Sequence, residues 1–314
     1  MYKETIPLWE EVETDKYQID AKALVAQVEL DYADVYRAQD VIRVKVHPQL
    51  NQKLIRSLIV GDKVYLDKEN FIVGRQVRQN KITRMRGDET RKGKLGKQEH
   101  LFAVNVDYAL IVATVDQPKF HAGLTERYLA TAYYNDVTPI IIINKCDIAG
   151  LDASILTYYS KTLGIKVIYT STITKQGIVE LKNEIKNNVC VFLGNSGVGK
   201  SSLINALKDV EELKTGDVNK KTGEGRHTTT RSSMYKLFDD TYVIDTPGIR
   251  NLDISNIDNK DLAFCYPDFE KYIGECKFID CTHTNEIDCA IKEAVAKGFI
   301  HEERYASYLG VYQN

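Results

Sequence analysis

Hydrophobic and polar positions follow two different rhythms along this chain of 314 residues. Between residues 20 and 77, short apolar stretches are separated by turn residues. Residues 41–46 alternate apolar and basic side chains after Val41, the period-2 pattern of a half-buried strand. Residues 60–66 and 71–73 predict two further strands. Several short strands in so short a segment favour a small β-barrel such as an OB-fold, a fold that often binds RNA; another small β-domain is the alternative.

From residue 104 the pattern changes to strands that alternate with helices, which indicates a parallel α/β sheet. Near-continuous apolar runs predict strands that are covered on both faces. These runs lie at residues 109–115, 139–143, 166–170, 189–193 and 242–244. Ligands of such sheets bind at the carboxyl ends of the strands, so the polar residues that follow each run are candidates for a binding site.

Past residue 252 the pattern becomes helical around a group of cysteines and a histidine. Residues 293–296 predict a helix that stops at Gly298, a glycine C-cap. The chain is therefore expected to be multidomain. Its predicted parts are a β-barrel with a basic loop at residues 1–98, an α/β nucleotide-binding domain at 99–252, and a mostly helical metal-binding domain at 253–314.

One apolar strand runs directly into a loop of the form G-x-x-x-x-G-K-[ST], and helix-forming residues that begin at Ser202 follow it. In such a loop the backbone N–H groups surround phosphates, the lysine reaches the outer phosphates, and the hydroxyl binds Mg²⁺. The helix N-terminus adds its dipole to the anion site. The loop comprises Gly194, Asn195, Ser196, Gly197, Val198, Gly199, Lys200 and Ser201.

A second motif, N-K-x-D, follows the apolar run at residues 139–143 and comprises Asn144, Lys145 and Asp147. A carboxylate such as Asp147 accepts hydrogen bonds from guanine, so the pair of motifs favours GTP over ATP. Ser171 follows the next strand and fits the loop whose backbone meets the guanine. Because the phosphate loop comes after the guanine motif, the chain order is that of a circularly permuted P-loop GTPase, which closely spaced termini allow.

The remaining nucleotide motifs lie between residues 225 and 249. Asp245 and Gly248 belong to a D-x-P-G motif, in which the carboxylate holds Mg²⁺, largely through water, and the Gly248 N–H senses the γ-phosphate. A mobile threonine, Thr229 or Thr230, is expected to complete the Mg²⁺ shell. Ile249 stands where Ras-like enzymes place the glutamine that orients water, so intrinsic hydrolysis should be slow.

His227, beside these threonines, is the candidate for positioning the hydrolytic water, since a neutral imidazole accepts a proton near pH 7. The alternative is a loop histidine without a catalytic role.

Composition adds two expectations. Hydrophobic content of 43% and charged content of 27% are ordinary for a globular protein, and no run is long enough to span a membrane. The N-terminus has no apolar core, so we expect a cytoplasmic protein.

The net charge is only −2, yet nine basic and two acidic side chains lie between Arg75 and Lys97. Residues 80–98 are predicted to be a flexible linker or loop that contacts RNA phosphate, or else a solvated charge run.

Four of the six cysteines lie in the C-terminal quarter, where a disulfide is less expected than a metal in a cytosolic protein. Three thiolates and one imidazole form a closed tetrahedral set for one structural Zn²⁺. The predicted ligands are Cys276, Cys281, His283 and Cys289. Their C-x4-C-x-H-x5-C spacing is uncommon, so buried cysteines without metal remain the alternative. Cys265 is expected to pack rather than to bind.

Taken together, these motifs resemble the ribosome small-subunit-dependent GTPase A family (RsgA, also called YjeQ). The resemblance spans most of the chain and includes an Asn-Val-Asp sequence at 105–107. It implies an OB-fold, a permuted GTPase and a zinc domain, with GTP hydrolysis stimulated by the small (30S) ribosomal subunit during its late maturation. Two departures stand out: residues 286–289 read Glu-Ile-Asp-Cys where the family usually has Glu-Pro-Gly-Cys, and the barrel matches only loosely.

We therefore expect a monomeric GTPase that binds GTP or GDP with Mg²⁺ and contacts the 30S subunit and its 16S rRNA through basic residues. Three alternatives remain open. The first is a GTP-sensing RNA-binding module with negligible turnover, since Ile249 removes the usual glutamine. The second is a permuted GTPase for the large subunit. The third, a P-loop kinase or ATPase, is disfavoured by Asp147.

Overall fold

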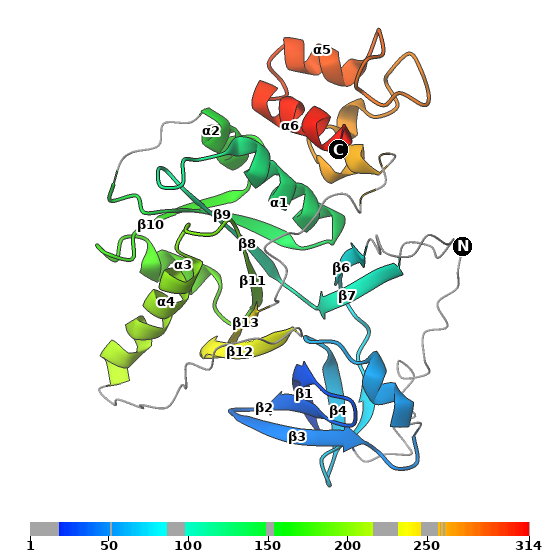
Figure 1. Cartoon of the computed structure of the whole chain (residues 1–314), viewed down its shortest axis with the longest axis vertical. Helices are drawn as coiled ribbons and strands as arrows, with labels where there is room; N and C mark the ends of the chain where they lie inside the picture. Colours follow the sequence, from blue (N-terminus) through cyan, green and yellow to red (C-terminus); the bar gives the residue numbers. More distant parts are fainter. Residues whose placement is uncertain are drawn as a thin grey trace.

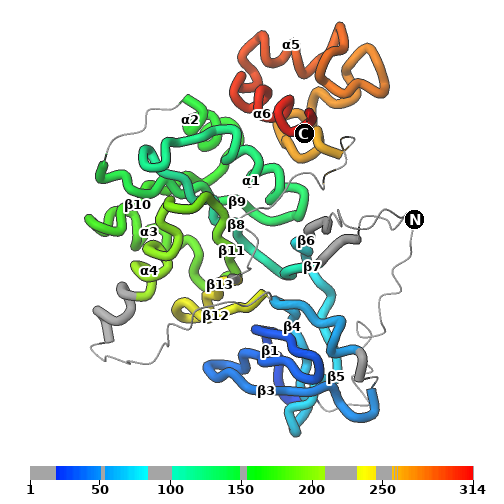
Figure 2. Tube along the Cα trace, in the orientation of Figure 1, coloured from blue at the N-terminus to red at the C-terminus, as the bar shows by residue number. Residues whose placement is uncertain are grey.

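The computed structural model describes residues 19–50, 52–86, 98–148, 154–215, 232–245, 257, 259 and 261–313. Figure 1 shows a small barrel, an α/β layer and a helical C-terminal part, in that order along the chain. The trace in Figure 2 runs from the blue barrel through the green sheet to the red C-terminal helix.

The N-terminal part is a closed five-stranded barrel in the order β1-β2-β3-β5-β4. Its strands are β1 (Ile19–Val28), β2 (Ala33–Arg37), β3 (Asp40–Val46), β4 (Lys63–Asp67) and β5 (Phe71–Arg75), with the 3-10 helix η1 (Gln52–Ser57) between β3 and β4. Inward-facing aliphatic side chains, among them Val25, Val35 and Ile72, fill its interior. The predicted small barrel is confirmed, and β3 lies within one residue of its expected bounds.

A two-stranded antiparallel ribbon connects the barrel to the sheet. It consists of β6 (Lys81–Arg86) and β7 (Gln98–Val104). The prediction that residues 80–98 form a loop is therefore wrong for residues 81–86 and 98, and residues 87–97 lie outside the described residues. Ile82 is buried, but the two apolar residues of this strand, Ile82 and Met85, are three positions apart, so the sequence shows no period-2 pattern.

The central sheet has six strands in the order β10-β9-β8-β11-β13-β12. These are β8 (Tyr108–Thr114), β9 (Thr138–Asn144), β10 (Lys166–Thr170), β11 (Val189–Leu193), β12 (Ser233–Phe238) and β13 (Thr241–Asp245). All pair in parallel except β12, which is antiparallel to β13 at the edge. The predicted parallel strands are confirmed, whereas β12 was not predicted.

Four helices cover the two faces of this sheet. Side chains of α1 (Ala122–Tyr134) and α2 (Ser154–Lys161) contribute to the core on one face. Those of α3 (Ile178–Glu184) and α4 (Lys200–Thr215) contribute to the core on the other. The core on the α1 face also includes Ala26 and Val60 of the barrel, so apolar packing continues from the barrel into the sheet.

The C-terminal part comprises η4 (Leu262–Cys265), η5 (Glu270–Tyr272), α5 (Ala290–Ala296) and α6 (Glu302–Tyr312). Its core is aromatic, with the ring of Tyr266 stacked on that of Phe269 at 4.9 Å, and it packs against α1. Gly298 follows α5 with a positive φ of 75°, as the predicted glycine C-cap requires.

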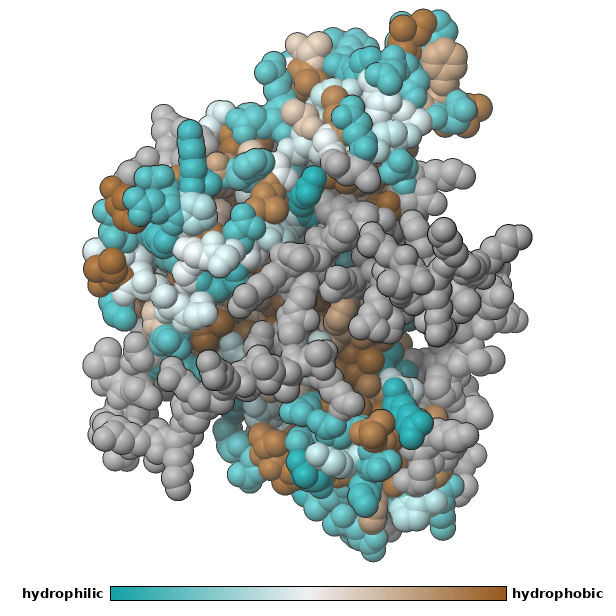
Figure 3. All heavy atoms as spheres, viewed as in Figure 1, coloured by the Kyte–Doolittle hydropathy of each residue, from teal (hydrophilic) through white to brown (hydrophobic). Residues whose placement is uncertain are grey.

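On the face shown in Figure 3, hydrophilic and hydrophobic residues are interspersed over both the barrel and the C-terminal part. Among the residues that the structure describes, no helix has the length and apolar character needed to cross a membrane.

Candidate nucleotide-binding site and metal cluster

The predicted phosphate loop connects the carboxyl end of β11 to the first turn of α4, which begins at Lys200. Gly194 and Gly199 adopt positive φ values of 142° and 92°. A β-carbon at Gly194 would lie 2.4 Å from the Val112 carbonyl oxygen, so the adjacent strand β8 leaves no room for a side chain there. Ser201 and Ser202 are exposed at the start of α4. The loop therefore presents open backbone at a helix N-terminus, the arrangement that binds phosphates.

Lys200 folds over this loop. Its Nζ donates hydrogen bonds to the carbonyl oxygens of Gly194 (2.6 Å) and Asn195 (2.7 Å). The ammonium group thus lies at the mouth of the loop, where the motif expects it to meet outer phosphates.

The N-K-x-D motif lies at the end of β9 and contacts the phosphate loop directly. The buried amide of Asn144 donates to the Val198 carbonyl oxygen (2.9 Å) and accepts from Thr170 Oγ1 (3.1 Å). Lys145 Nζ donates to the carbonyl oxygens of Gln117 (2.7 Å) and Gly197 (2.8 Å). Asparagine and lysine therefore hold two loops together, and Asp147 remains exposed beside them.

Ser171 organises the loop after β10. Its buried hydroxyl oxygen accepts hydrogen bonds from the backbone N–H groups of Ile173 (3.2 Å) and Thr174 (3.1 Å). The Cys146 N–H donates to the Thr170 carbonyl oxygen (3.1 Å), which joins this loop to the N-K-x-D motif. The sheet thus gathers the phosphate loop, Asp147 and the Ser171 loop at the carboxyl ends of its strands, as the sequence predicted.

Asp245 is the last residue of β13, and its backbone pairs with Ser233 of β12. β13 pairs in parallel with β11, so its carboxyl end lies on the same side of the sheet as the phosphate loop. The other predicted switch residues, His227, Thr229, Thr230 and Gly248, lie outside the described residues. Their roles, like the Mg²⁺-binding role of Asp245, stay predictions.

The four predicted metal ligands meet in the C-terminal part. One ligand atom from each of Cys276, Cys281, His283 and Cys289 lies within 4.8 Å of the others. Cys276 Sγ lies 3.9 Å from Cys289 Sγ, and these two sulfurs lie 3.5 and 3.6 Å from His283 Nδ1. Ligands at tetrahedral zinc distances are separated by about 3.8 Å for two sulfurs and about 3.6 Å for sulfur and nitrogen, so the donor set fits that ion.

Polar contacts around the cluster support its loops. Tyr305 donates from its hydroxyl to the His283 carbonyl oxygen (2.8 Å), and Tyr308 donates to that of Thr282 (2.7 Å). Burial raises the pKa of Glu286, but hydrogen bonds from Thr282 and Thr284 outweigh it and lower that pKa to about 2. Asp288 takes a φ of 53°, the left-handed conformation that glycine favours. The four ligands thus converge although an aspartate holds this conformation.

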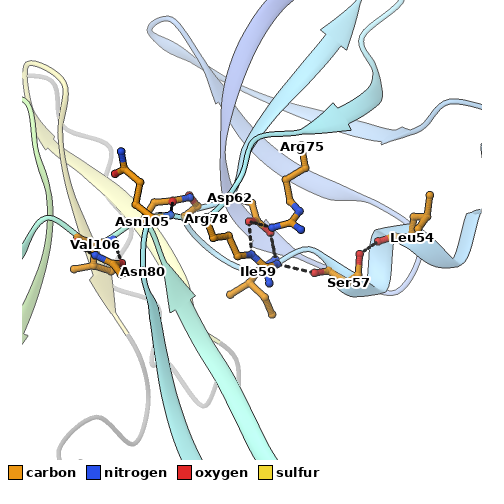
Figure 4. Close-up of polar contacts among 11 residues, drawn as sticks. Leu54, Ser57, Ile59, Asp62, Arg75, Arg78, Asn80, Asn105 and Val106 are labelled. Atoms are coloured by element: carbon orange, nitrogen blue, oxygen red, sulfur yellow. Dashed lines mark hydrogen bonds and ion pairs between the residues drawn. The ribbon is translucent and has the colours of Figure 1, made fainter. Parts of the chain in front are cut away.

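Sequence reasoning missed the polar contacts that join the barrel to the sheet (Figure 4). Asp62 is fully buried and accepts from the Arg78 guanidinium (2.8 Å) and from the Ile59 N–H (2.8 Å). Beside it, Asn105 Nδ2 donates to the Gly61 carbonyl oxygen (2.8 Å), and the Asn80 amide exchanges two hydrogen bonds with the backbone of residue 106. The Asn-Val-Asp sequence noted above thus has a structural role at the entry to β8.

A second missed feature joins the C-terminal part to the α/β layer. Arg304 of α6 is fully buried and pairs with Glu126 of α1 (2.5 Å) and with Asp268 (2.8 Å). Burial disfavours its charge, but the two carboxylates outweigh burial and raise the Arg304 pKa. The guanidinium therefore stays charged and holds α6 on α1.

Comparisons with known proteins agree with this geometry. Residues 76–255 match the family model described as RsgA GTPase. A relative from Chlorobaculum tepidum, named small ribosomal subunit biogenesis GTPase RsgA, is 38% identical over 80% of this chain and 83% of its own length. A protein of the same name from Bacteroides fragilis is 35% identical over 87% of this chain and 90% of its own.

Two solved structures have the same fold. YjeQ from Thermotoga maritima superposes with a TM-score of 0.72 at 28% identity, covering 93% of this chain and 97% of that one. YloQ, described as a circularly permuted GTPase, gives a TM-score of 0.67 at 25% identity over 93% and 94% of the two chains. A family model that spans more than half of the sequence, and relatives that match most of it, lead to one conclusion: the chain belongs to the RsgA GTPase family.

Proposed function

We propose that this protein is a GTP hydrolase that acts in the maturation of the small ribosomal subunit and turns over faster when bound to it. The observation that carries the proposal is the joining of the N-K-x-D motif to the phosphate loop through Asn144 and Lys145. The relatives whose names specify small ribosomal subunit biogenesis support the choice of partner.

The nucleotide would lie across the carboxyl ends of the parallel strands. The guanine would meet Asp147 and the Ser171 loop, while the phosphates would lie against residues 194–201 and Lys200. Ser201, Asp245 and one of Thr229 and Thr230 are the groups that would hold Mg²⁺. The ion, when bound, neutralises charge that develops on the β- and γ-phosphates.

Ile249 cannot orient water, so the chain alone should hydrolyse GTP slowly. We assign the water-positioning role to His227 and expect the Gly248 N–H to sense the γ-phosphate. A small-subunit partner would then accelerate turnover by ordering these segments, and loss of the γ-phosphate would loosen them and release the protein.

The Cys/His cluster is proposed to hold one structural Zn²⁺, which would stabilise a C-terminal part with a small core. We also propose that the domain boundaries lie near residues 98 and 252. The barrel and the basic stretch would contact 16S rRNA phosphate, so binding should weaken as salt rises. We further propose a monomer that works in the cytoplasm, where the subunit matures.

Co-sedimentation tests the choice of partner. Protein loaded with a non-hydrolysable GTP analogue should pellet with purified 30S particles and stay in solution with 50S particles. Pelleting with 50S particles alone would favour the large-subunit alternative and contradict the proposal.

A further inference from the structure

The barrel covers the lateral edge of the central sheet that is formed by β12. β12 is the edge strand, and an edge strand presents backbone groups that have no partner strand. The Lys236 N–H on this edge donates a 2.9 Å hydrogen bond to the hydroxyl oxygen of Tyr36, at the end of β2. Figure 1 shows the barrel strands directly beside β12.

Further contacts surround this hydrogen bond. Lys236 Nζ donates to Gln39 Oε1 (2.6 Å), and the ring of Tyr36 lies 4.9 Å from that of Tyr242 on β13. Burial raises the pKa of Tyr36, so its hydroxyl stays protonated at neutral pH. Tyr242 belongs to the apolar core that the barrel and the sheet share. A single barrel tyrosine thus contacts both strands of the β12–β13 hairpin.

This hairpin connects the two predicted switches. In the sequence, β12 follows residues 225–230 and β13 ends at Asp245. Lys236 pairs with Tyr242, and Ser233 pairs with Asp245 three residues farther along the ladder. Three residues of a strand span about 10 Å, so the Tyr36 contact lies about that far from the backbone of Asp245, the predicted Mg²⁺ ligand, on the same hydrogen-bonded ladder.

The barrel has a second, separate attachment to the sheet. Asn105, which precedes β8, bonds the Gly61 carbonyl oxygen, and Asp62 fixes Arg78 beside it (Figure 4). β8 lies in the middle of the sheet, whereas β12 lies at its edge. A shift of the hairpin relative to β8 would therefore also move Lys236 relative to Tyr36.

We propose that Tyr36 is a positioning residue that couples the barrel to the nucleotide through the β12–β13 hairpin. This rests on the proposed function, because that function makes the hairpin the connection between the switches. A contact that differs between the GTP and GDP states changes the relative affinity for the two nucleotides, and the coupling is reciprocal. Engagement of the barrel by RNA phosphate would then be transmitted to the nucleotide along the same path.

The test uses the full chain and three proteins: wild type, Tyr36→Phe and the matched control Tyr65→Phe. Tyr65 is on β4 of the same barrel, with its ring 5.9 Å from Lys22 Nζ. Calorimetry gives the affinities for GDP and a GTP analogue with Mg²⁺, and hydrogen exchange gives the protection of the Lys236 N–H. For Tyr36→Phe we expect faster exchange at Lys236 and a change of about fivefold in the ratio of the two affinities. The control should match wild type in both.

Each other outcome has a distinct meaning. Faster exchange at Lys236 with an unchanged affinity ratio would make Tyr36 merely structural and overturn the proposal. Unchanged exchange would show that the contact does not form in solution, and the proposal would fall with it. If the ratio changes while the wild type fails to pellet with 30S particles, the coupling stands and the ribosomal function fails. If the wild type binds neither nucleotide, both fail.

Discussion

The backbone of Gly199 passes so close to the Asn144 amide that a β-carbon at residue 199 would lie 2.4 Å from Asn144 Nδ2. That amide cannot easily move aside, because it is buried and bonded to the Val198 carbonyl oxygen and to Thr170. The two nucleotide motifs are therefore packed against each other with no space for a side chain between them.

The first prediction concerns Gly199→Ala. The substitution should lower GDP affinity at least about tenfold, because it displaces the amide and breaks one or both of its hydrogen bonds. Gly274→Ala is the matched control: its φ of 91° is nearly that of Gly199 (92°), but no atom lies within 4 Å of the added carbon. Calorimetric titration with GDP would distinguish them. Equal affinities for the two variants would contradict the role of the Gly199–Asn144 contact.

The second prediction concerns the buried pair between α6 and α1. Arg304→Met leaves Glu126 and Asp268 buried without their cation, which should lower the free energy of unfolding by about 3–5 kcal/mol. Lys297→Met removes an exposed ion pair with Glu293 and should change it by less than about 1 kcal/mol. Urea denaturation followed by far-UV circular dichroism measures both. A loss for Arg304→Met as small as that of the control would contradict the role of this pair.

The sequence predicted the parts of the fold that depend on local pattern. β10 and β11 both have their predicted bounds, and the apolar run of β11 is continuous and buried, whereas Lys166 and Tyr169 of β10 are exposed. β12 was missed because an edge strand is half exposed and its residues, Ser-Met-Tyr-Lys-Leu-Phe, show no clear period. An antiparallel strand at the edge of a parallel sheet also lies outside the simple alternation of strand and helix.

The candidate site divides in the same way. The phosphate loop, the guanine motif and the four metal ligands were found because their spacing carries the chemistry. Arg304 was not found, since its partners lie 178 and 36 residues away and a helical arginine is ordinarily exposed. Asp62 bonds Arg78, 16 residues away, and Tyr36 bonds Lys236, 200 residues away, and only the tertiary structure brings these pairs together.

The third prediction concerns the metal cluster. Purified wild-type protein should carry about one zinc per chain, and Cys281→Ser should carry none, because three ligands hold the ion far less well than four. Cys265→Ser is the control, since this buried thiol lies outside the cluster. Metal analysis by mass spectrometry gives the stoichiometry. Zinc retained at full occupancy in Cys281→Ser, or absent from wild type, would contradict the assignment.

The fourth prediction concerns His227, which lies outside the described residues. His227→Ala should lower GTP turnover by about 100-fold or more, the usual contribution of a group that handles the attacking water. GTP affinity should stay near the wild-type value. Single-turnover hydrolysis and a binding titration measure the two quantities. Unchanged turnover would end the assignment of this histidine.

The central claim is that guanine and triphosphate are held by the packed loops of this sheet and that the small subunit accelerates hydrolysis. GTP turnover measured with and without purified 30S particles tests it most directly. We predict slow turnover by the chain alone and a rise of at least about tenfold with 30S particles, since a partner must supply what Ile249 cannot. The same rate with and without 30S particles would contradict the account.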